Sequence, residues 1–159
     1  MIPMKNGYDG FRGEYAFLSN MYCCQIEYDG CRFPSAEHMF QAYKFKKFMK
    51  NPDIFRGFCK SLATMSPSQI KNYAKKCAPI KSGEWDTIRV DVMRLCIQCK
   101  FDQNITLRNK LILTGDTELI EYNYWGDTFW GKALQKNGDF VGENTLGRLL
   151  MEYRDKTLR

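Results

Sequence analysis

The stretch FPSAEHMFQAYKF, from Phe33 to Phe45, decides much of the fold because it joins the end of a strand to the start of a helix. Pro34 stops the strand, and Ser35 is suited to cap the helix that follows. We therefore expect a helix from Ala36 to about Phe48. The same stretch holds the single histidine of the chain, beside a glutamate and a lysine.

Three polar residues of this helix share one stripe. From Glu37 through Gln41 to Lys44 the chain advances seven positions, which is nearly two helical turns and about 10 Å from end to end. Aromatic residues flank the stripe, an arrangement that suggests the wall of a cleft. His38 is turned about 100° away from Glu37, so we expect it to be a packed, hydrogen-bonded residue.

Glu37 falls in the first helical turn, where the helix dipole favours an ionised carboxylate. An ionised carboxylate is suited to stabilising a cationic transition state or to activating water. It is less suited to donating a proton, unless burial outweighs the dipole. The spacing alone leaves a second interpretation open, in which Glu37 only stabilises the first turn of its helix.

The elements around this helix indicate a helix-rich α+β fold with about five to six helices and short strands, in a single domain over residues 1–159. The longest helix is expected at Glu84–Asp102, where apolar residues recur at helical spacing. Residues 125–144 are glycine-rich and aromatic, and we expect a loop of functional importance there. The other expected elements are a hairpin of Tyr22–Tyr28 and Cys31–Phe33 across Asp29–Gly30, helices begun by Asn51–Pro52 (to Leu62) and Ser66–Pro67 (to Cys77), a helix Leu107–Leu113 capped by Thr106, a strand in ELIEYNY (residues 118–124), and a last helix capped by Asn144.

The net charge is +6, from 24 Lys and Arg against 18 Asp and Glu. This excess favours anionic partners, but the basic residues are scattered along the sequence rather than gathered into one segment. No segment reaches the roughly 18 apolar residues of a membrane span, and the start MIPMKNGYDG lacks the apolar run of a signal peptide. We expect no membrane partner.

The chain has seven cysteines. Two of them, Cys96 and Cys99, form a CxxC motif inside the longest expected helix. With one histidine and no second CxxC, neither a zinc site nor any other metal site is expected. An odd number of cysteines without a signal peptide favours free thiols in a reducing compartment, so we expect a cytoplasmic protein.

Six segments in order resemble the successive motifs of the YbiA-like, or NADAR, family, and together they cover nearly the whole chain. One departure is KALQKNGDF (residues 132–140), which fills a loop that is usually compact in this family. The six segments are FLSNMY (17–22), PSAEHMFQAYKF (34–45), WDTIRVDVM (85–93), KFDQNITLRNKLILTGD (100–116), WGDTFWG (125–131) and GENTLGRLLMEYR (142–154).

The resemblance implies a single helix-rich domain with N-glycosidase activity, which cleaves the bond between ribose and an amine or a base. Two substrate classes are implied: ribosylaminopyrimidine phosphates of the riboflavin pathway, and ADP-ribose attached to guanine. The expected partner is therefore a phosphorylated ribosyl compound or an ADP-ribosylated nucleic acid. No cofactor is expected.

Breaking an N-glycosidic bond builds positive charge on the ribose, and a carboxylate beside C1 lowers that barrier. Glu37 is the candidate for this carboxylate. Lys44, which matches the lysine of the family motif, is either a nucleophile that forms a Schiff base with C1 or a ligand of phosphate. Asp127 is a candidate for positioning water or binding ribose hydroxyls.

The other candidates are expected to bind substrate. Trp85 and Trp130 are candidates for stacking on a base, while Gly142 and Asn144 would offer backbone N–H groups to a phosphate at a helix start. The remaining candidates are Asn20 and Gln41, and Arg148 as a weaker phosphate ligand.

A second class of function stays open: a non-catalytic module that binds ADP-ribose or a nucleotide. Such a module would need the tryptophans and the helix start, but it would not need Glu37 together with Lys44. A general nucleic-acid-binding protein would need a continuous basic groove, which the scattered charge does not favour.

Overall fold

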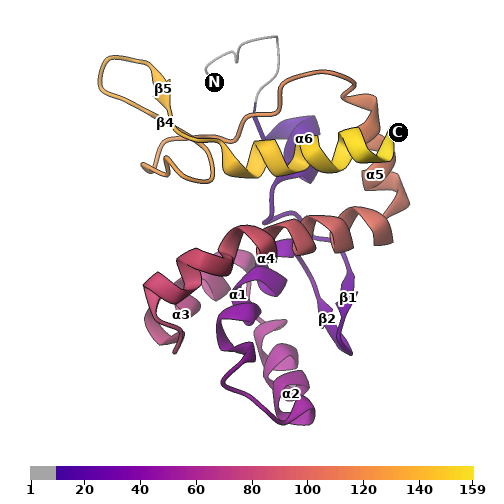
Figure 1. The fold of residues 1–159 in the computed structure, drawn as a ribbon, viewed down its shortest axis with the longest axis vertical. Coiled ribbons are helices and arrows are strands. Elements are labelled where there is room, and N and C mark those ends of the chain that lie inside the picture. Colours follow the sequence, from indigo (N-terminus) through magenta and orange to yellow (C-terminus); the bar gives the residue numbers. More distant parts are fainter. Residues whose placement is uncertain (1–9) are drawn as a thin grey trace. The chain divides into compact units, whose positions relative to one another are not determined.

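The computed structural model describes residues 10–159, and these form six α-helices, one 3₁₀ helix and five short strands (Figure 1). The prediction of a helix-rich α+β fold is confirmed. By their internal contacts the residues fall into two compact units. We call Asn20–Ile105 the helical unit, and residues 10–19 with Thr106–Arg159 the sheet unit.

The helical unit begins with the predicted hairpin. Strands β1 (Ile26–Tyr28) and β2 (Cys31–Phe33) pair antiparallel. Asp29 and Gly30 both have positive φ, 53° and 76°, as a two-residue hairpin turn requires. The first strand is shorter than predicted, since β1 begins at Ile26; before it, the Cys24 N–H still donates to the Pro34 carbonyl over 3.0 Å.

Three helices of this unit begin at the predicted caps. The Ser35 hydroxyl accepts from the His38 N–H at the start of α1 (Ala36–Lys46). Asn51 caps α2 (Pro52–Leu62) in the same way. Ser66 opens α3 (Pro67–Cys77) with a reciprocal capping box, which satisfies two backbone N–H groups at the helix start. Only the end of α1 differs, two residues before the predicted one.

The core of the helical unit surrounds α1, which packs against α2, α3 and α4 (Ser82–Gln103) (Figure 1). The helix α4 is the longest, as predicted. Because α1 has helices on several sides, even its polar stripe is withdrawn from water. The fully buried core residues here include Met39, Leu62, Ile70, Met93 and Ile97.

The sheet unit contains the 3₁₀ helix η1 (Gly13–Leu18), α5 (Ile105–Leu113), α6 (Thr145–Thr157) and a three-stranded sheet. Strand β3 (Tyr122–Asn123) runs parallel to β4 (Lys132–Leu134), and β4 pairs antiparallel with β5 (Phe140–Val141). Phe140 packs on a small cluster of Ile120 and Tyr122.

Two predictions for this unit were wrong. Residues 125–144 are not one loop, because Asn137–Gly138 turns the chain and lets β4 pair with β5; Gly138 has φ 90°. Thr106 does not cap α5, since the helix begins at Ile105. The short strand predicted within residues 118–124 is confirmed as β3, which pairs at Tyr122 and Asn123.

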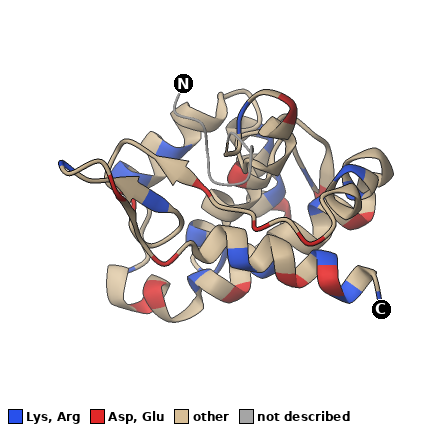
Figure 2. Cartoon of the chain, turned by 90° about the horizontal axis from the view of Figure 1, so that it is seen from above, with Lys and Arg blue, Asp and Glu red and all other residues tan. Residues whose placement is uncertain are grey.

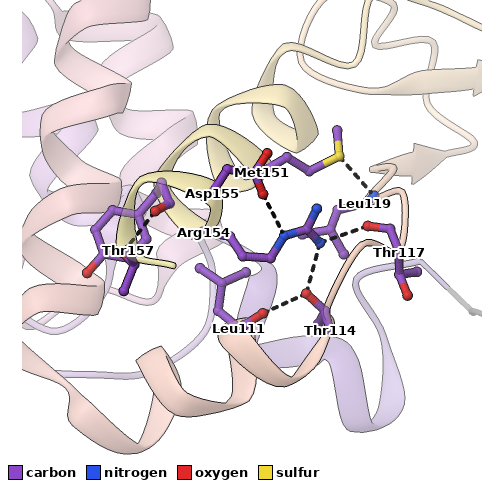
Figure 3. A network of polar contacts seen from close by, with 9 residues as sticks. Leu111, Thr114, Thr117, Leu119, Met151, Arg154, Asp155 and Thr157 are labelled. Carbon is purple, nitrogen blue, oxygen red and sulfur yellow. Dashed lines mark hydrogen bonds and ion pairs between the residues drawn. The ribbon is translucent and has the colours of Figure 1, made fainter. Parts of the chain in front are cut away.

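A buried arginine holds α6 to the turn after α5. Figure 3 shows Arg154, whose side chain is 4% exposed, reaching from α6 toward that turn. Its Nη1 donates to the Thr114 hydroxyl over 3.0 Å and to the Thr117 carbonyl over 2.8 Å, and its Nε lies 3.3 Å from Asp155 Oδ1. These bonds give the buried guanidinium partners in the turn after α5, so Arg154 supports the fold.

Charges are interspersed on the surface. Along α6, basic and acidic residues alternate towards the C-terminus (Figure 2). This arrangement agrees with the expectation of scattered charge rather than a continuous basic stripe. Among residues 10–159, no helix has both the length and the apolar character needed to span a membrane.

Candidate functional site

The predicted stripe on α1 exists, and its first two members touch. Glu37 is 6% exposed and Gln41 is 4% exposed. The Gln41 Nε2 donates to Glu37 Oε1 over 2.7 Å. The backbone carbonyl of Asn20 accepts from the Glu37 N–H over 3.0 Å, and the Asn20 Nδ2 lies 3.2 Å from Met93 Sδ. Asn20 therefore lies against the start of α1, next to Glu37.

Gln41 keeps one polar atom without a partner. Its Oε1 is buried and has no hydrogen bond within the described residues. An ionised carboxylate only accepts, so the amide must present its N–H₂ to Glu37 and turn its oxygen elsewhere. A buried acceptor left unsatisfied costs about 1–3 kcal/mol. This oxygen is therefore available to a donor that the protein itself does not supply.

Lys44 completes the stripe beside two aromatic rings. Its Nζ lies 5.3 Å from the centre of the Trp85 ring and 5.9 Å from the centre of the Phe40 ring. The two rings meet edge to face, with centroids 5.0 Å apart. Trp85 is 8% exposed, so its ring faces protein groups, among them Lys44 and Phe40, rather than solvent. The rings hold a half-buried ammonium within reach of cation–π attraction.

Burial moves the two ionisable groups of the stripe toward neutrality. It raises the pKa of Glu37, against the opposing effects of the Gln41 hydrogen bond, Lys71 and Lys44. It lowers the pKa of Lys44; Lys71 lowers it further and Glu37 opposes the shift. The helix dipole was expected to favour the ionised form of Glu37; burial acts in the opposite direction and raises its pKa.

Lys71 is a charge at this site that the sequence analysis missed. It lies on the exposed face of α3, and it acts on both Glu37 and Lys44. Its place follows from the packing of α3 against α1. The spacing of residues along one helix does not indicate which other helix packs against it. The position of Lys71 near the stripe could therefore be found only from the fold.

His38 has the structural role that was expected. It is 1% exposed, and its Nε2 lies 2.9 Å from the Met65 carbonyl. A carbonyl only accepts, so Nε2 carries the proton, and the neutral Nδ1 accepts from the Ser35 hydroxyl over 2.7 Å. Burial lowers the pKa of His38, which agrees with a neutral ring that fastens α1.

In the sheet unit, Asp127 organises its own loop. Its Oδ1 accepts from the N–H groups of Phe129 and Trp130, over 3.0 and 2.9 Å. Its backbone N–H and carbonyl both pair with the side chain of Asn123. This carboxylate oxygen is therefore already engaged in folding the loop. The Trp130 ring is half-buried and meets Phe129 edge to face, with centroids 4.9 Å apart.

The backbone N–H groups at the start of α6 were expected to bind phosphate, but in the structure they already have hydrogen-bond partners. Those of residues 143–146 donate in turn to the carbonyls of Thr128, Gly131, Phe129 and Trp130. Gly142 is needed for this close approach, because a Cβ there would lie 2.2 Å from the Gly131 carbonyl oxygen. The helix start that was predicted to bind phosphate therefore hydrogen-bonds to the preceding loop and holds that loop against the helix.

Asn144 also differs from the prediction. It stands at the cap position in the left-handed region, φ 56°, but its side chain makes no capping hydrogen bond. Instead, its Oδ1 accepts from the Glu121 N–H over 3.0 Å and its Nδ2 donates to the Leu119 carbonyl over 2.9 Å. Asn144 therefore binds the segment before β3 to the start of α6.

Arg148 is the candidate of the sheet unit with most freedom. It is exposed, and its Nη2 makes one long contact of 3.3 Å with the Thr145 hydroxyl. The structure thus brings five candidates together in the helical unit: Asn20, Glu37, Gln41, Lys44 and Trp85. Within the sheet unit, Asp127, Trp130, Gly142 and Asn144 belong to one hydrogen-bonded loop and helix start.

The described residues form no candidate metal-binding site. Over residues 10–159, no three His, Cys, Asp or Glu side chains gather closely enough to hold a metal ion. All seven cysteines are free thiols. Burial raises the pKa of Cys96 well above its usual range, so this thiol behaves as an apolar core group.

Curated relatives in bacteria resemble this chain over most of its length. A riboflavin biosynthesis protein of Vibrio vulnificus is 38% identical over 142 residues, which are 89% of this chain. The match spans only 35% of that longer protein. The N-glycosidase YbiA of Escherichia coli is 31% identical over 147 residues, which cover 90% of this chain and 82% of YbiA.

The fold has a solved counterpart in the NMR structure of the Escherichia coli protein YbiA. The two structures superpose with a TM-score of 0.73 at 29% sequence identity, covering 95% of this chain and 83% of that one. The NADAR domain family matches residues 8–158. The resemblance seen in the six sequence segments is thereby confirmed, and this chain belongs to the NADAR domain family.

Proposed function

We propose that this chain is an N-glycosidase that hydrolyses the bond between C1 of a phosphorylated ribose and an amine or base nitrogen. The observation that carries the proposal is the α1 stripe, where a buried acid and a half-buried amine have pKa values shifted toward each other. Opposed shifts of this kind mark acid–base sites. The name of YbiA as an N-glycosidase supports the same class of reaction.

Glu37 is proposed to act on the anomeric carbon in two ways. Its carboxylate would stabilise the positive charge that grows on C1 and the ring oxygen as the C1–N bond breaks. The raised pKa of Glu37 also makes the carboxylate a stronger base, which favours removal of a proton from the attacking water.

Lys44 is proposed to be the nucleophile rather than a phosphate ligand. Burial and Lys71 lower its pKa, which increases the neutral fraction that can attack carbon. The amine would bond to C1 as the C1–N bond breaks, and one amine proton would pass to the departing nitrogen. The ribose ring would then open: the bond from C1 to the ring oxygen breaks, the remaining N–H proton passes to that oxygen, and C1 and the lysine nitrogen form an imine. Water, deprotonated by Glu37, would add to C1, and the resulting carbinolamine would expel the lysine nitrogen, which takes up the proton, so that the ribose is released as its aldehyde and the lysine is restored.

Gln41 is proposed to bind the sugar. Its Oε1 is the buried acceptor without a partner, and a ribose hydroxyl is a donor of the right kind. The other amide group of Gln41 holds Glu37 in place over 2.7 Å. One side chain would thus fix both the acid and the sugar, which lowers the entropic cost of their meeting.

A ribosylaminopyrimidine phosphate is the first substrate to test, because the Vibrio vulnificus relative is named a riboflavin biosynthesis protein. ADP-ribosylated guanine in DNA is the second. The free thiols support a reducing, cytoplasmic setting for either reaction.

The test is to incubate the full chain with each substrate separately and to identify products by mass spectrometry. The proposal expects free ribose phosphate, or free ADP-ribose, together with the released amine or base. A protein that binds either compound without releasing a product would instead be the non-catalytic ADP-ribose or nucleotide-binding module.

A further inference from the structure

The helical unit contains a cavity that lies away from the α1 stripe. This cavity measures about 610 Å³ and lies among β-hairpin, α1, α2 and α4 residues. Its volume falls within the roughly 300–1,000 Å³ that small-molecule sites occupy. Its lining includes Tyr43 and Lys46 of α1 and Lys47, the residue that caps the end of α1. At 100° per residue they lie roughly 130° round the helix from the Glu37 stripe.

The cavity has an apolar wall and a cationic rim. The wall comes from helix ends and the segment before α4, and the rim carries four basic side chains. The apolar lining residues are Met49, Pro52, Phe55, Ile80 and Ile88, and the basic ones are Lys46, Lys47, Lys50 and Arg56.

The carboxylates that pair with the rim cations are exposed, and one of them, Asp29, itself lines the cavity. Lys46 also lies over the half-buried rings of Tyr28 and Tyr43. Lys46 pairs with Asp29 over 3.1 Å, Lys47 pairs with Glu84, and Arg56 pairs with Asp53 over 3.3 Å. Ion pairs as exposed as these are weak, because water and salt screen them. An incoming anion would therefore replace the carboxylates easily. Lys50 is exposed and makes no ion pair within the described residues.

Arg56 is placed at the rim by the hairpin turn. Gly30 has φ 76°, and a Cβ at that position would lie 2.6 Å from Arg56 Nε. The turn therefore needs glycine for its backbone angle, and the exposed guanidinium of Arg56 lies in the space beside it. A planar guanidinium is suited to phosphate, which it binds through two parallel hydrogen bonds.

We propose that this cavity is a second ligand site, which binds an organic phosphate with a flat apolar body. The phosphate would lie at Lys50 and Arg56, and the apolar body would lie against Ile80, Ile88 and Phe55. The site is separate from the proposed glycosidase chemistry. The probe used to test it therefore contains no ribose, so that failure of either proposal is recognised independently.

The test is titration of the full chain with 1-naphthyl phosphate, followed by backbone amide NMR. Inorganic phosphate and 1-naphthol, each alone, separate the two parts of the probe. The proposal expects saturable shifts confined to residues 29–30, 43–56 and 80–88, with affinity at least about tenfold higher than that of either part. Equal binding of inorganic phosphate, shifts elsewhere, or no saturation at millimolar concentrations would overturn it.

Two variants address the two halves of the cavity. Lys50→Glu removes a rim cation and Ile88→Trp fills the hollow, and each is expected to weaken binding of the probe about tenfold. Lys60→Glu, an exposed change on the same helix α2, is the matched control and is expected to leave affinity within about twofold. Unchanged affinity in both Lys50→Glu and Ile88→Trp would contradict the assignment.

Discussion

Two regions of the chain bury polar side chains, and they use them differently. Around Asn144 in the sheet unit, both polar atoms of the side chain and four consecutive backbone N–H groups have partners. On the α1 stripe of the helical unit, Gln41 Oε1 has none, and burial shifts the pKa values of Glu37 and Lys44.

The difference separates residues that build the fold from residues that are available to a substrate. A satisfied polar network stabilises one conformation and offers nothing to a ligand. An unsatisfied acceptor beside ionisable groups lowers stability, and binding of a donor removes that cost. Both regions carry family motifs, so membership in a motif does not by itself assign a chemical role.

The largest expected effect comes from Lys44→Arg, which keeps the charge but removes the nucleophilic amine. We expect kcat to fall about 100-fold or more, the scale of a lost group that acts in the reaction. Borohydride added during turnover should link the ribose to Lys44 in the original chain and should give no adduct in the variant. Near-normal kcat in Lys44→Arg would make Lys44 a phosphate ligand.

Asn144→Ala should lower the stability of the fold, which would distinguish the Asn144 region from the α1 stripe. It leaves the Glu121 N–H and the Leu119 carbonyl without their partners, and alanine disfavours the left-handed backbone. We expect the free energy of unfolding to fall by roughly 2–4 kcal/mol, measured by urea titration. Asn137→Ala, at an exposed turn of the same unit, is the control; an equal loss there would remove the special role of Asn144.

Gln41→Leu should show the opposite pattern. Leucine removes a buried acceptor that has no partner, which is favourable, and also the hydrogen bond to Glu37, which is not. Because these two effects oppose each other, the free energy of unfolding should fall by only about 1 kcal/mol. Losing a hydrogen bond to the sugar should raise KM about tenfold. A large loss of stability with unchanged KM would place Gln41 among the residues that build the fold.

Lys71→Met is expected to have the smallest effect. Lys71 lowers the pKa of both Glu37 and Lys44, so its removal raises both values, and both limbs of the pH–rate profile should move to higher pH. Because Lys71 is exposed and screened, the change in kcat at neutral pH should stay below about threefold and should shrink with added salt. Lys76→Met, on the same helix, should leave the profile in place.

The local part of this account was predictable from sequence. Ser35, Asn51 and Ser66 cap the helices that they were expected to cap. The Glu37 stripe followed from helical geometry alone. These features depend on neighbours within one or two turns of the chain, which the spacing of residues records.

The part that sequence could not supply depends on distant partners. Asn144 binds groups that lie 23 and 25 residues away, and its side chain therefore does not make the local cap that the pattern indicated. The β4–β5 hairpin was missed because the Asn137–Gly138 turn signal stands within a glycine-rich segment. Burial of Glu37, which reverses the expected direction of its pKa shift, depends on helices that fold over it.

The most direct test of the central claim is a single-turnover measurement on Glu37→Gln at saturating substrate. The account predicts that cleavage of the C1–N bond slows by about 10³-fold, while substrate affinity and unfolding free energy stay close to those of the original chain. Glu84→Gln, in the first turn of α4, should keep the original rate. Cleavage by Glu37→Gln within about tenfold of that rate would contradict a chemical role for this carboxylate.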